Sequence, residues 1–488
     1  MATQCNMRVQ ARAVVERSGA FLRVSDDKFN GELPHHFVRR APCASANRHS
    51  RGAHPSAVSC SIDTVQVKVT PTFLALSGEV QTGPNTFWTK AALQYARNAA
   101  DVEWLRAYLP TLRNASEFCF GLIDPAEAML NAPGVWCVRA ARRIGARPGL
   151  SASARHTPPR VWVIAPGSLM IDVFIRANFT ADSNAMMAGF LLEFAQAERA
   201  VGNATRADEL AALAQRLRAA MNARLWSADD DHFVTQLNPD GSTRDFVDYD
   251  SNLIAVAHGV PNTTARSQAV LARVDRGRCS AASGAGPQFV SEKWYGTNDT
   301  THGNTGDSWC SMGRIAWFDA HARKLLGRPS DLAAFDAQLS VLQRDLIANT
   351  WMHERYGCDG NQQLNRTSHY FEYPSTVAML LREVRYGIEL GYATVTIDPF
   401  GPRAFNYHVG NVNVDYGSHA VSISVPGAGE RLFTVKHLAA ATEFSFALSG
   451  ACAAARRPPP PASSDASGTL SFSAAVGVDC IVSASASQ

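Results

Sequence analysis

The sequence predicts a mainly α-helical fold, an α/α-hairpin toroid of paired helices, followed by a small antiparallel β-sandwich domain. From about residue 85 to about residue 390, apolar residues recur at helical spacing in stretches of similar length, which Gly-, Asn- and Asp-rich loops join in pairs. From about residue 391 onward, apolar and polar residues alternate instead, and Gly and Pro interrupt the alternation. No repeat is exact in sequence, so a solenoid is not indicated.

The helical part, residues 85–390, is expected to be organised in helix pairs. The expected helices cover residues 87–98 and 100–119, then 182–201 and 203–225, and then 248–258, 264–274, 306–326, 331–349 and 373–390. In the first, antiparallel pair, Trp88, Leu93, Trp104 and Leu112 fall on apolar faces. In the second pair, an Asn-Ala-Thr sequence at residues 203–205 supplies the start of a helix.

The C-terminal part, residues 391–488, is expected to be a β-sandwich domain. Its expected strands are residues 393–397, 405–409, 411–415, 420–425, 432–436, 443–448 and, as the last strand, 469–475. The proline run at residues 458–461 and the serine-rich stretch after it predict a flexible loop before that last strand.

Two segments depart from this organisation. Residues 1–84 are expected to be a leader or a poorly ordered segment with short strands, because residues 1–62 are rich in Arg, Ser and Ala and show no clean periodicity. A transit-type leader and an error in the gene prediction are both open alternatives. Residues 135–167 lack helical and strand rhythm, and the chain reads smoothly when they are removed. They are interpreted as an insertion, either translated intron sequence or a surface loop.

The composition is that of a globular protein and argues against several functions. Hydrophobic residues make up 46% and charged residues 18% of the 488 residues. A net charge of +3 without a lysine-rich stripe argues against a nucleic-acid partner. The sequence has no apolar run of about 18 residues, so no membrane span is predicted. The 10 cysteines include no C-x-x-C pair, so no metal site is expected. No cofactor is predicted. Six glycosylation sequons suit a secreted protein, yet no apolar signal-peptide core follows Met1, which leaves the compartment open.

Carboxylates, bases and aromatic rings are concentrated in one turn-rich region. Residues 351–356 read Trp-Met-His-Glu-Arg-Tyr, and residues 369–374 read His-Tyr-Phe-Glu-Tyr-Pro. Hydrolysis of a glycosidic bond uses one carboxylic acid to protonate the leaving oxygen and one carboxylate to activate water or attack the sugar, and flat rings hold a pyranose. The pattern therefore predicts a sugar-cleaving site that contains Glu354, His369 and Tyr370.

Three further clusters lie in loops before expected helices, where a helical toroid has its active site. They are residues 171–176, with Asp172 and Arg176, residues 245–252, with Asp250, and residues 292–309, with Trp294, Asn304 and Asp307. The apolar neighbours of Asp172 favour a raised pKa and the role of acid. His353 and Arg355 beside Glu354 favour its ionised form and the role of base.

Each cluster also has a purely structural interpretation. Asp182 is interpreted as a helix N-cap, and capping is the alternative for Asp248 and Asp250. For Asp172 the alternative is a buried pairing with Arg176. For Glu354 it is an ion pair with a nearby arginine, and for residues 303–307 a turn ahead of a helix. The aromatic side chains are equally explained by packing in the core.

On these motifs the chain resembles the six-hairpin glycosidases, the (α/α)6-toroid superfamily that includes α-L-rhamnosidases, trehalases and processing glucosidases. Residues 351–356 are similar to the segment that carries the catalytic base of α-L-rhamnosidases. Residues 368–370 and 380–388 resemble the segment that closes their toroid, and residues from 397 onward resemble their C-terminal β domain. Residues 171–176 look similar to the trehalase segment with the general acid, whereas the acidic motif of rhamnosidases is missing upstream. The resemblance covers roughly residues 85–450.

The resemblance implies a glycoside hydrolase of carbohydrate metabolism, similar to α-L-rhamnosidases, that acts with inversion on an oligosaccharide or glycoside. In this hypothesis Glu354 activates water and Asp172 protonates the leaving oxygen. The residues expected to bind sugar are Asp250, Asn304, Asp307, Trp294, Arg176, His369 and Tyr370. The alternative is a non-catalytic carbohydrate-binding toroid or a degenerate glycosidase homologue, which keeps the aromatic site but lacks a working acid.

Overall fold

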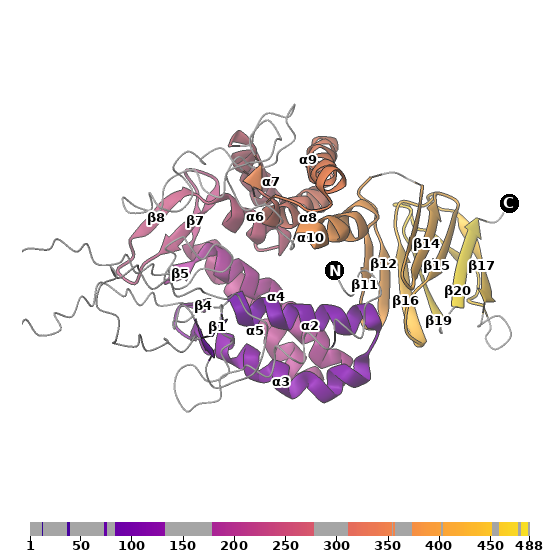
Figure 1. The fold of residues 1–488 in the computed structure, drawn as a ribbon, viewed down its shortest axis with the longest axis horizontal. Coiled ribbons are helices and arrows are strands. Elements are labelled where there is room, and N and C mark those ends of the chain that lie inside the picture. The colour runs from indigo at the N-terminus through magenta and orange to yellow at the C-terminus, as the bar shows by residue number, and fades with distance from the viewer. Residues whose placement is uncertain are drawn as a thin grey trace, which may run out of the picture.

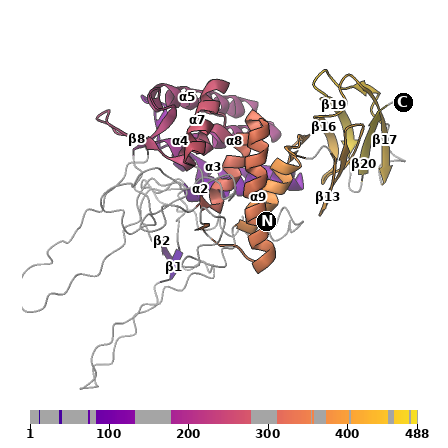
Figure 2. The ribbon, with the colours of Figure 1, turned by 90° about the horizontal axis from the view of Figure 1, so that it is seen from above.

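The computed structural model describes residue 12 and residues 37–39, 73–75, 83–131, 178–277, 311–353, 355–356, 373–401, 404–450, 458–476 and 480–486. Helices dominate up to residue 385 and strands from residue 388 onward, and the two parts lie beside each other (Figures 1 and 2). The prediction of a mainly helical protein with a β-rich C-terminal part is therefore confirmed. None of the described helices combines the length and the apolar character that crossing a membrane requires.

The helical part is built from consecutive helix pairs. The pairs are α2 (Gly83–Ala99) with α3 (Val102–Phe120), α4 (Ala181–Ala200) with α5 (Ala204–Arg224), α6 (Tyr249–Ala257) with α7 (Thr264–Arg276), and α8 (Ala316–Leu326) with α9 (Pro329–Asn349). Asp101, Asn203 and Thr263 cap α3, α5 and α7, and each side chain accepts a hydrogen bond from the backbone N–H three residues further on. These caps satisfy amides that a first helical turn leaves unpaired, so they fix where the second helix begins.

The first helices of successive pairs are neighbours. α2 packs on α4, α4 on α6 and α6 on α8, while α8 contacts the π-helical turn η3 (Leu380–Arg385) that continues α10 (Tyr373–Met379). Two hydrogen bonds connect η3 back to α2, from Arg382 to Asn98 (2.8 Å) and from Gln94 to Glu383 (3.3 Å). The last described helical segment before the β-rich part, η3, therefore contacts the first helix, α2.

Short strands precede several of these helices. β3 (Ile123–Asp124) pairs with β4 (Met129–Leu130), and β7 (His232–Leu237) pairs with β5 (Phe179–Thr180), β6 (Trp226–Ser227) and β8 (Thr243–Val247). β9 (Ser311–Met312) pairs with β10 (Arg355–Tyr356). Near the N-terminus, within the range expected to hold short strands, β1 (Phe37–Arg39) pairs with β2 (Phe73–Ala75).

The C-terminal part consists of two sheets that share one hydrophobic core. The first sheet has the order β11-β12-β16-β19, and the second has the order β13-β14-β15-β20-β17-β18. Their bounds are Ile388–Leu390 (β11), Thr394–Ile397 (β12), Phe405–Val409 (β13), Val412–Gly417 (β14), Ala420–Ser424 (β15), Gly429–Val435 (β16), Glu443–Gly450 (β17), Ala462–Ser463 (β18), Leu470–Val476 (β19) and Cys480–Ala486 (β20). Phe433 of the first sheet and Val414 and Phe444 of the second are fully buried in the same cluster, as in a β-sandwich.

Two details of the expected β-sandwich are wrong. Its sheets are not wholly antiparallel, because β12 runs parallel to β16, with Val395 opposite Phe433. Residues 469–475 are not the last strand, because β20 follows and lies between β15 and β17. In β20 the alternate residues Cys480, Val482 and Ala484 are buried, but serine and alanine fill the strand and give a weak hydrophobic alternation.

Two expected helices have different bounds. The helix expected over residues 373–390 ends at Arg385, because Gly387 has a φ of +62° and its Cα faces the backbone of Asp398, where a Cβ would lie 1.9 Å from the carbonyl oxygen. The described part of the helix expected over residues 306–326 begins instead with β9 and a 3-10 turn, Gly313–Ile315, before α8. Residues 306–310 lie outside the described residues.

Candidate functional site

Most of the predicted site residues lie in segments that lead into the first helices of the pairs. Asp172 and Arg176 come shortly before β5 and α4, and Trp294, Asn304 and Asp307 come before β9 and α8. His369 and Tyr370 come before α10, and Glu354 stands between His353 and β10. These residues lie outside the described ones, whereas Asp250 is described in the first turn of α6.

The pairing of β9 with β10 connects two of these segments. Arg355, the residue after Glu354, is paired with Met312, and Tyr356 is paired with Ser311. Asp307 lies four residues before Ser311 in the sequence. β10, which directly follows Glu354 in the sequence, is therefore held beside β9, the strand that precedes α8.

Asp345, near the end of α9, binds both flanks of Glu354. The backbone N–H of His353 donates to Oδ2 of Asp345 at 2.9 Å, and Nδ1 of His353 lies 3.1 Å from Oδ1. The phenol of Tyr356 donates to Oδ2 at 2.7 Å. Asn349 donates to Oδ1 at 2.8 Å. The chain is thus fixed one residue before Glu354 and two residues after it.

The surroundings of Asp345 strengthen these hydrogen bonds. Asp345 and Tyr356 are each 1% exposed, and the rings of Trp351 and His353 lie 4.5 Å apart. Burial raises the pKa of Tyr356, and the hydrogen bond to Asp345 raises it further, so the phenol stays a donor near neutral pH. Hydrogen bonds to a charged acceptor are strong where water is excluded.

Sequence reasoning missed Asp345, although a signal was present. Helical spacing places Asp345 on the same face of α9 as Phe335, Leu339 and Leu342, all of them buried. An acidic residue on an apolar helix face requires a polar partner, because an unpaired buried charge is costly. That partner is the predicted base motif.

The tripeptide Asp-Ser-Asn occurs in the first turn of α4 and again in the first turn of α6. Asn184 exchanges two hydrogen bonds with the backbone of Leu130 in β4, at 2.7 and 3.0 Å. Asn252 exchanges the equivalent pair with Phe233 in β7, at 2.8 and 3.1 Å. Each asparagine side chain thus bonds to the N–H and the C=O of one strand residue, as a neighbouring strand would. In this way it attaches a β-hairpin to the start of a helix.

The acidic residues of these tripeptides also correspond. Oδ1 of Asp182 accepts from the N–H of Ser183, and Oδ1 of Asp250 accepts from the N–H of Ser251, both at 2.7 Å. The interpretation of Asp182 as the N-cap is wrong, because Thr180 is the N-cap and Asp182 is the second helical residue. In α6 the N-cap is Asp248, whose Oδ2 accepts from the hydroxyl of Ser251 at 2.9 Å. Asp182 and Asp250 are both fully buried.

Within the described ranges, no three His, Cys, Asp or Glu side chains are grouped so that they could hold a metal ion. The residues predicted for the site offer carboxylates, an amide, a guanidinium, an imidazole and aromatic rings. Such groups can donate to sugar hydroxyls, accept from them and stack on a sugar ring.

Comparison with known proteins connects the middle of the chain to glycosidases. Residues 168–291 match the Mannosylglycerate hydrolase MGH1-like glycoside hydrolase domain. The match runs from just before Asp172 through α4–α7 and includes Arg176 and Asp250. The resemblance to glycosidases that the sequence indicates is confirmed over this range. A search of curated protein sequences gave no match.

Solved structures with a similar arrangement include two rhamnosidases. The GH78-family rhamnosidase of Bacillus sp. GL1 aligns with 72% of this chain at 16% identity and a TM-score of 0.45. A rhamnosidase from Klebsiella oxytoca with rhamnose bound aligns with 65% at 14% identity and a TM-score of 0.42. An uncharacterised conserved protein from Thermus thermophilus aligns with 78% at 13% identity and a TM-score of 0.48.

The chain spans only part of some of these proteins. The alignments cover 32% of the Bacillus enzyme and 49% of the Klebsiella enzyme, but 89% of the Thermus protein. Each TM-score is below 0.5, so these likenesses assign no activity to the chain.

Proposed function

We propose that the chain is a glycoside hydrolase whose residues 85–390 form an (α/α)6 toroid and whose residues 391–488 form a β-sandwich domain. The match of residues 168–291 to a glycoside hydrolase domain carries this proposal. The packing of α2, α4, α6 and α8 on one another, with their partner helices following each of them, supports a toroid of helical hairpins. In this proposal residues 135–167 are an insertion between α3 and α4.

In the proposed mechanism Glu354 is the general base and Asp172 the general acid. Glu354 removes a proton from the attacking water, whose oxygen bonds to the anomeric carbon as the glycosidic bond breaks, and Asp172 protonates the leaving oxygen. The water attacks the face opposite the leaving group, so the anomeric centre is inverted. The fixed backbone on both sides of Glu354 supports the role of base, because a base must be held within reach of its water. Asp250, Asn304, Asp307, Trp294, Arg176, His369 and Tyr370 bind the sugar, and a rhamnoside is one candidate substrate.

Hydrolysis of aryl glycosides tests the proposal. The full chain is incubated with a panel of p-nitrophenyl glycosides that includes α-L-rhamnosides and α- and β-glucosides, and released nitrophenol is measured. We expect Glu354→Gln and Asp172→Asn to lower turnover by about 10²–10⁴-fold, the usual contribution of a general acid or base. Glu103→Gln, at an exposed position of α3, is the matched control and should keep full activity. Sugar binding without turnover by the unaltered chain would instead establish the non-catalytic alternative.

The stereochemistry tests the assignment of the two carboxylates. Proton NMR of the first product should show the anomer opposite to that of the substrate. In an experimental structure the carboxyl groups of Asp172 and Glu354 should be about 6.5–9.5 Å apart, whereas about 5 Å indicates retention. A separation beyond about 12 Å rejects the pair as acid and base.

A further inference from the structure

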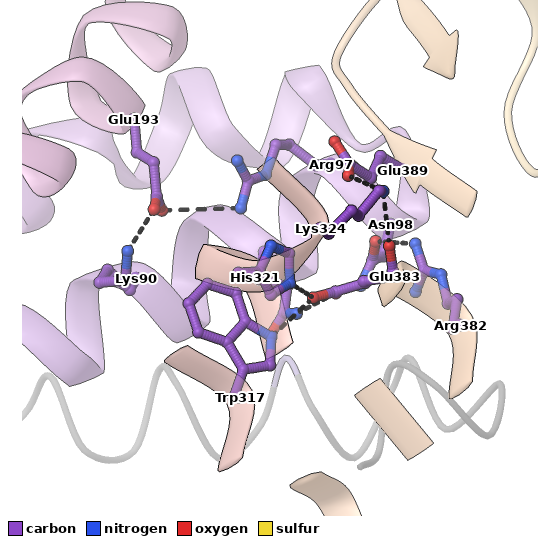
Figure 3. A network of polar contacts seen from close by, with 11 residues as sticks. Lys90, Arg97, Asn98, Glu193, Trp317, His321, Lys324, Arg382, Glu383 and Glu389 are labelled. Atoms are coloured by element: carbon purple, nitrogen blue, oxygen red, sulfur yellow. Dashed lines mark hydrogen bonds and ion pairs between the residues drawn. The ribbon is translucent and has the colours of Figure 1, made fainter. Parts of the chain in front are cut away.

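A cavity of about 600 Å³ lies between α2, α4, α8, α10 with η3, and the strands β11 and β12. This volume falls within the range typical of small-molecule sites. Among the described residues that line it, none is assigned above to catalysis or to sugar binding. Polar side chains of its wall are shown in Figure 3.

The charges on the wall compensate one another. Glu193 of α4 pairs with Lys90 and Arg97 of α2 (Figure 3). Burial alone would raise the pKa of Glu193, but these two cations outweigh it and lower that pKa, so the carboxylate stays ionised.

A second group of charges lies on η3, β11 and α8. Glu383 accepts from the indole N–H of Trp317 at 3.0 Å and from Gln94 at 3.3 Å. Lys324 donates to Glu389 at 3.1 Å and to the backbone carbonyl of Glu383 at 3.0 Å. An anionic ligand would therefore face the carboxylates Glu193, Glu383 and Glu389. A cationic ligand would face Lys90, Arg97 and Arg382.

His321 adds no charge to this wall. Burial and the nearby Lys324 lower the pKa of His321 to about 3, so the imidazole is neutral at physiological pH. Its ring lies 4.0 Å from that of Trp317, centroid to centroid.

The wall keeps hydrogen-bonding capacity for a ligand. Asn98 is 8% exposed, and its Oδ1 accepts from Arg382 at 2.8 Å. Its Nδ2 has no hydrogen-bond partner among the described residues. Asn98 therefore acts on the wall through Arg382, whose guanidinium it holds beside the cavity. The hydroxyl-bearing residues Thr376 and Thr394 line the same cavity, as do the rings of Phe87 and Trp317.

We propose that this cavity binds a neutral polyhydroxylated ligand, namely a single sugar unit. Sugar hydroxyls both donate and accept, which fits a wall of alternating carboxylates, cations and amides whose charges are already balanced. The pyranose ring has an apolar face, which fits Trp317 and Phe87. None of the described wall residues belongs to the proposed catalytic or sugar-binding set, so sugar binding here is proposed whether or not the chain hydrolyses a glycoside.

Isothermal titration calorimetry of the full chain at pH 7 tests the proposal. The neutral probes are D-glucose, D-mannose and L-rhamnose, and the charged probes are D-glucuronate and D-glucosamine. At least one neutral sugar should bind about tenfold or more tightly than both charged sugars. Equal or tighter binding of a charged sugar, or no binding of any neutral sugar, overturns the proposal.

Three variants locate the binding site. Asn98→Ala removes the amide, and Thr376→Val removes one wall hydroxyl with little change of shape; each should weaken binding at least fivefold. Asn114→Ala, at an exposed position of α3, is the matched control and should bind like the unaltered chain. Thr376→Val keeps the test decisive if Asn98→Ala does not fold. Unchanged binding in folded variants at both wall positions overturns the proposal.

Glu354→Gln separates this site from the proposed active site. We expect this variant to bind the sugar with unchanged affinity even where its turnover is lost. If Glu354→Gln abolishes binding, the sugar occupies the catalytic centre and the proposal of a separate site is wrong. If the chain has no hydrolase activity and Asn98→Ala still weakens binding, only the proposed function fails.

Discussion

Asp345 and His353 are joined by two interactions, from the backbone N–H and from Nδ1 of His353 to the two oxygens of one carboxylate. His353 immediately precedes Glu354, the proposed base, and the same carboxylate accepts from Tyr356 two residues after it. A residue of α9 therefore sets the backbone of a motif on the connection to α10. In the proposed mechanism Asp345 is a positioning residue that acts through Glu354.

Asp345→Asn is expected to disturb the base motif more than its small change in shape implies. The amide nitrogen is not an acceptor for the donors that now share the carboxylate, and unsatisfied buried donors cost about 1–3 kcal/mol each. We expect the free energy of unfolding to fall by about 2–3 kcal/mol. In the glycosidase assay kcat should fall at least tenfold, with little change in KM, because the base is displaced while sugar contacts remain.

Asp336→Asn is the matched control on the same helix. Asp336 pairs with Arg385, but its side chain is 43% exposed, so the change should cost less than about 1 kcal/mol. Urea denaturation and initial rates are measured for both variants. Equal losses of stability in the two variants, or an unaltered kcat in Asp345→Asn, would contradict the assigned role.

The two asparagines of the repeated tripeptide should have matching effects on stability. Asn184→Ala leaves both backbone groups of Leu130 without their partner, and Asn252→Ala does the same to Phe233. Each variant should lose about 2–4 kcal/mol of unfolding free energy, since two buried backbone groups lose their bonds. Thermal melts followed by circular dichroism measure the effect. The exposed Asn114→Ala should stay within about 0.5 kcal/mol of the unaltered chain, and a similar result for Asn252→Ala would disprove the structural role.

Much of the helical part could be predicted because its signals are local. Apolar residues at helical spacing and a cap residue such as Asn203 place the helices within a few residues of their observed bounds. The end of the last helix could not be placed, since it depends on the backbone of Asp398 folding back onto Gly387, a contact that helical spacing does not reveal. The strand β20 could not be predicted either, because its serine and alanine residues alternate in burial but hardly in hydrophobicity.

The candidate site shows the same limit. The types of residue around Glu354 predict its chemistry, but the matched glycoside hydrolase domain ends at residue 291, so the role of Glu354 stays a prediction. The partner of the motif, Asp345, lies on a helix eight residues before His353 and becomes its neighbour only when the chain folds back. The sequence favours Asp182 as a cap because Asp, Ser and Asn all suit that position, but the backbone places the cap at Thr180. Residue preference indicates a helix start without fixing its register.

Arg323 of α8 should be among the most important charged residues for stability. Its guanidinium bonds to Asp319 at 2.9 Å and to Asp331 at 3.0 Å and pairs with Asp275, although its side chain is only 2% exposed. Burial opposes the charge, but these carboxylates outweigh it and raise the pKa of Arg323. Arg323→Met removes the shared cation from buried carboxylates and should cost about 3–5 kcal/mol.

The control for Arg323→Met is Arg199→Met, which breaks an ion pair with Asp208 on the surface. Both side chains of that pair are more than half exposed, at 58% and 71%, so its loss should cost less than about 1 kcal/mol. Guanidinium chloride denaturation of the two variants gives the comparison. Arg323→Met with a stability equal to that of Arg199→Met would show that the buried network contributes little.

His258 and His321 should make the stability depend on pH. Burial and nearby cations lower the pKa of each from 6.5 to about 3. Between pH 3 and 6.5 the unfolded chain therefore binds more protons than the folded chain, and stability rises with pH through this window. The contribution of the two neutral histidines to the free energy of unfolding is fully present above pH 6.5. As the pH falls below 6.5, this contribution is lost by up to about 1.4 kcal/mol per pH unit for each histidine.

Urea denaturation at intervals between pH 4 and pH 7 measures this dependence. His258→Gln and His321→Gln each remove a group that must stay neutral in the folded chain, so the slope of unfolding free energy against pH should become flatter in each. His419→Gln is the matched control, because it makes the same change at an exposed position of the β-rich part. Carboxylates elsewhere titrate in the same range, so the unaltered chain also has a slope. Each variant's slope is therefore compared with those of the other variants and of the unaltered chain. Identical slopes for all three variants and the unaltered chain would show that the two buried imidazoles accept protons without unfolding.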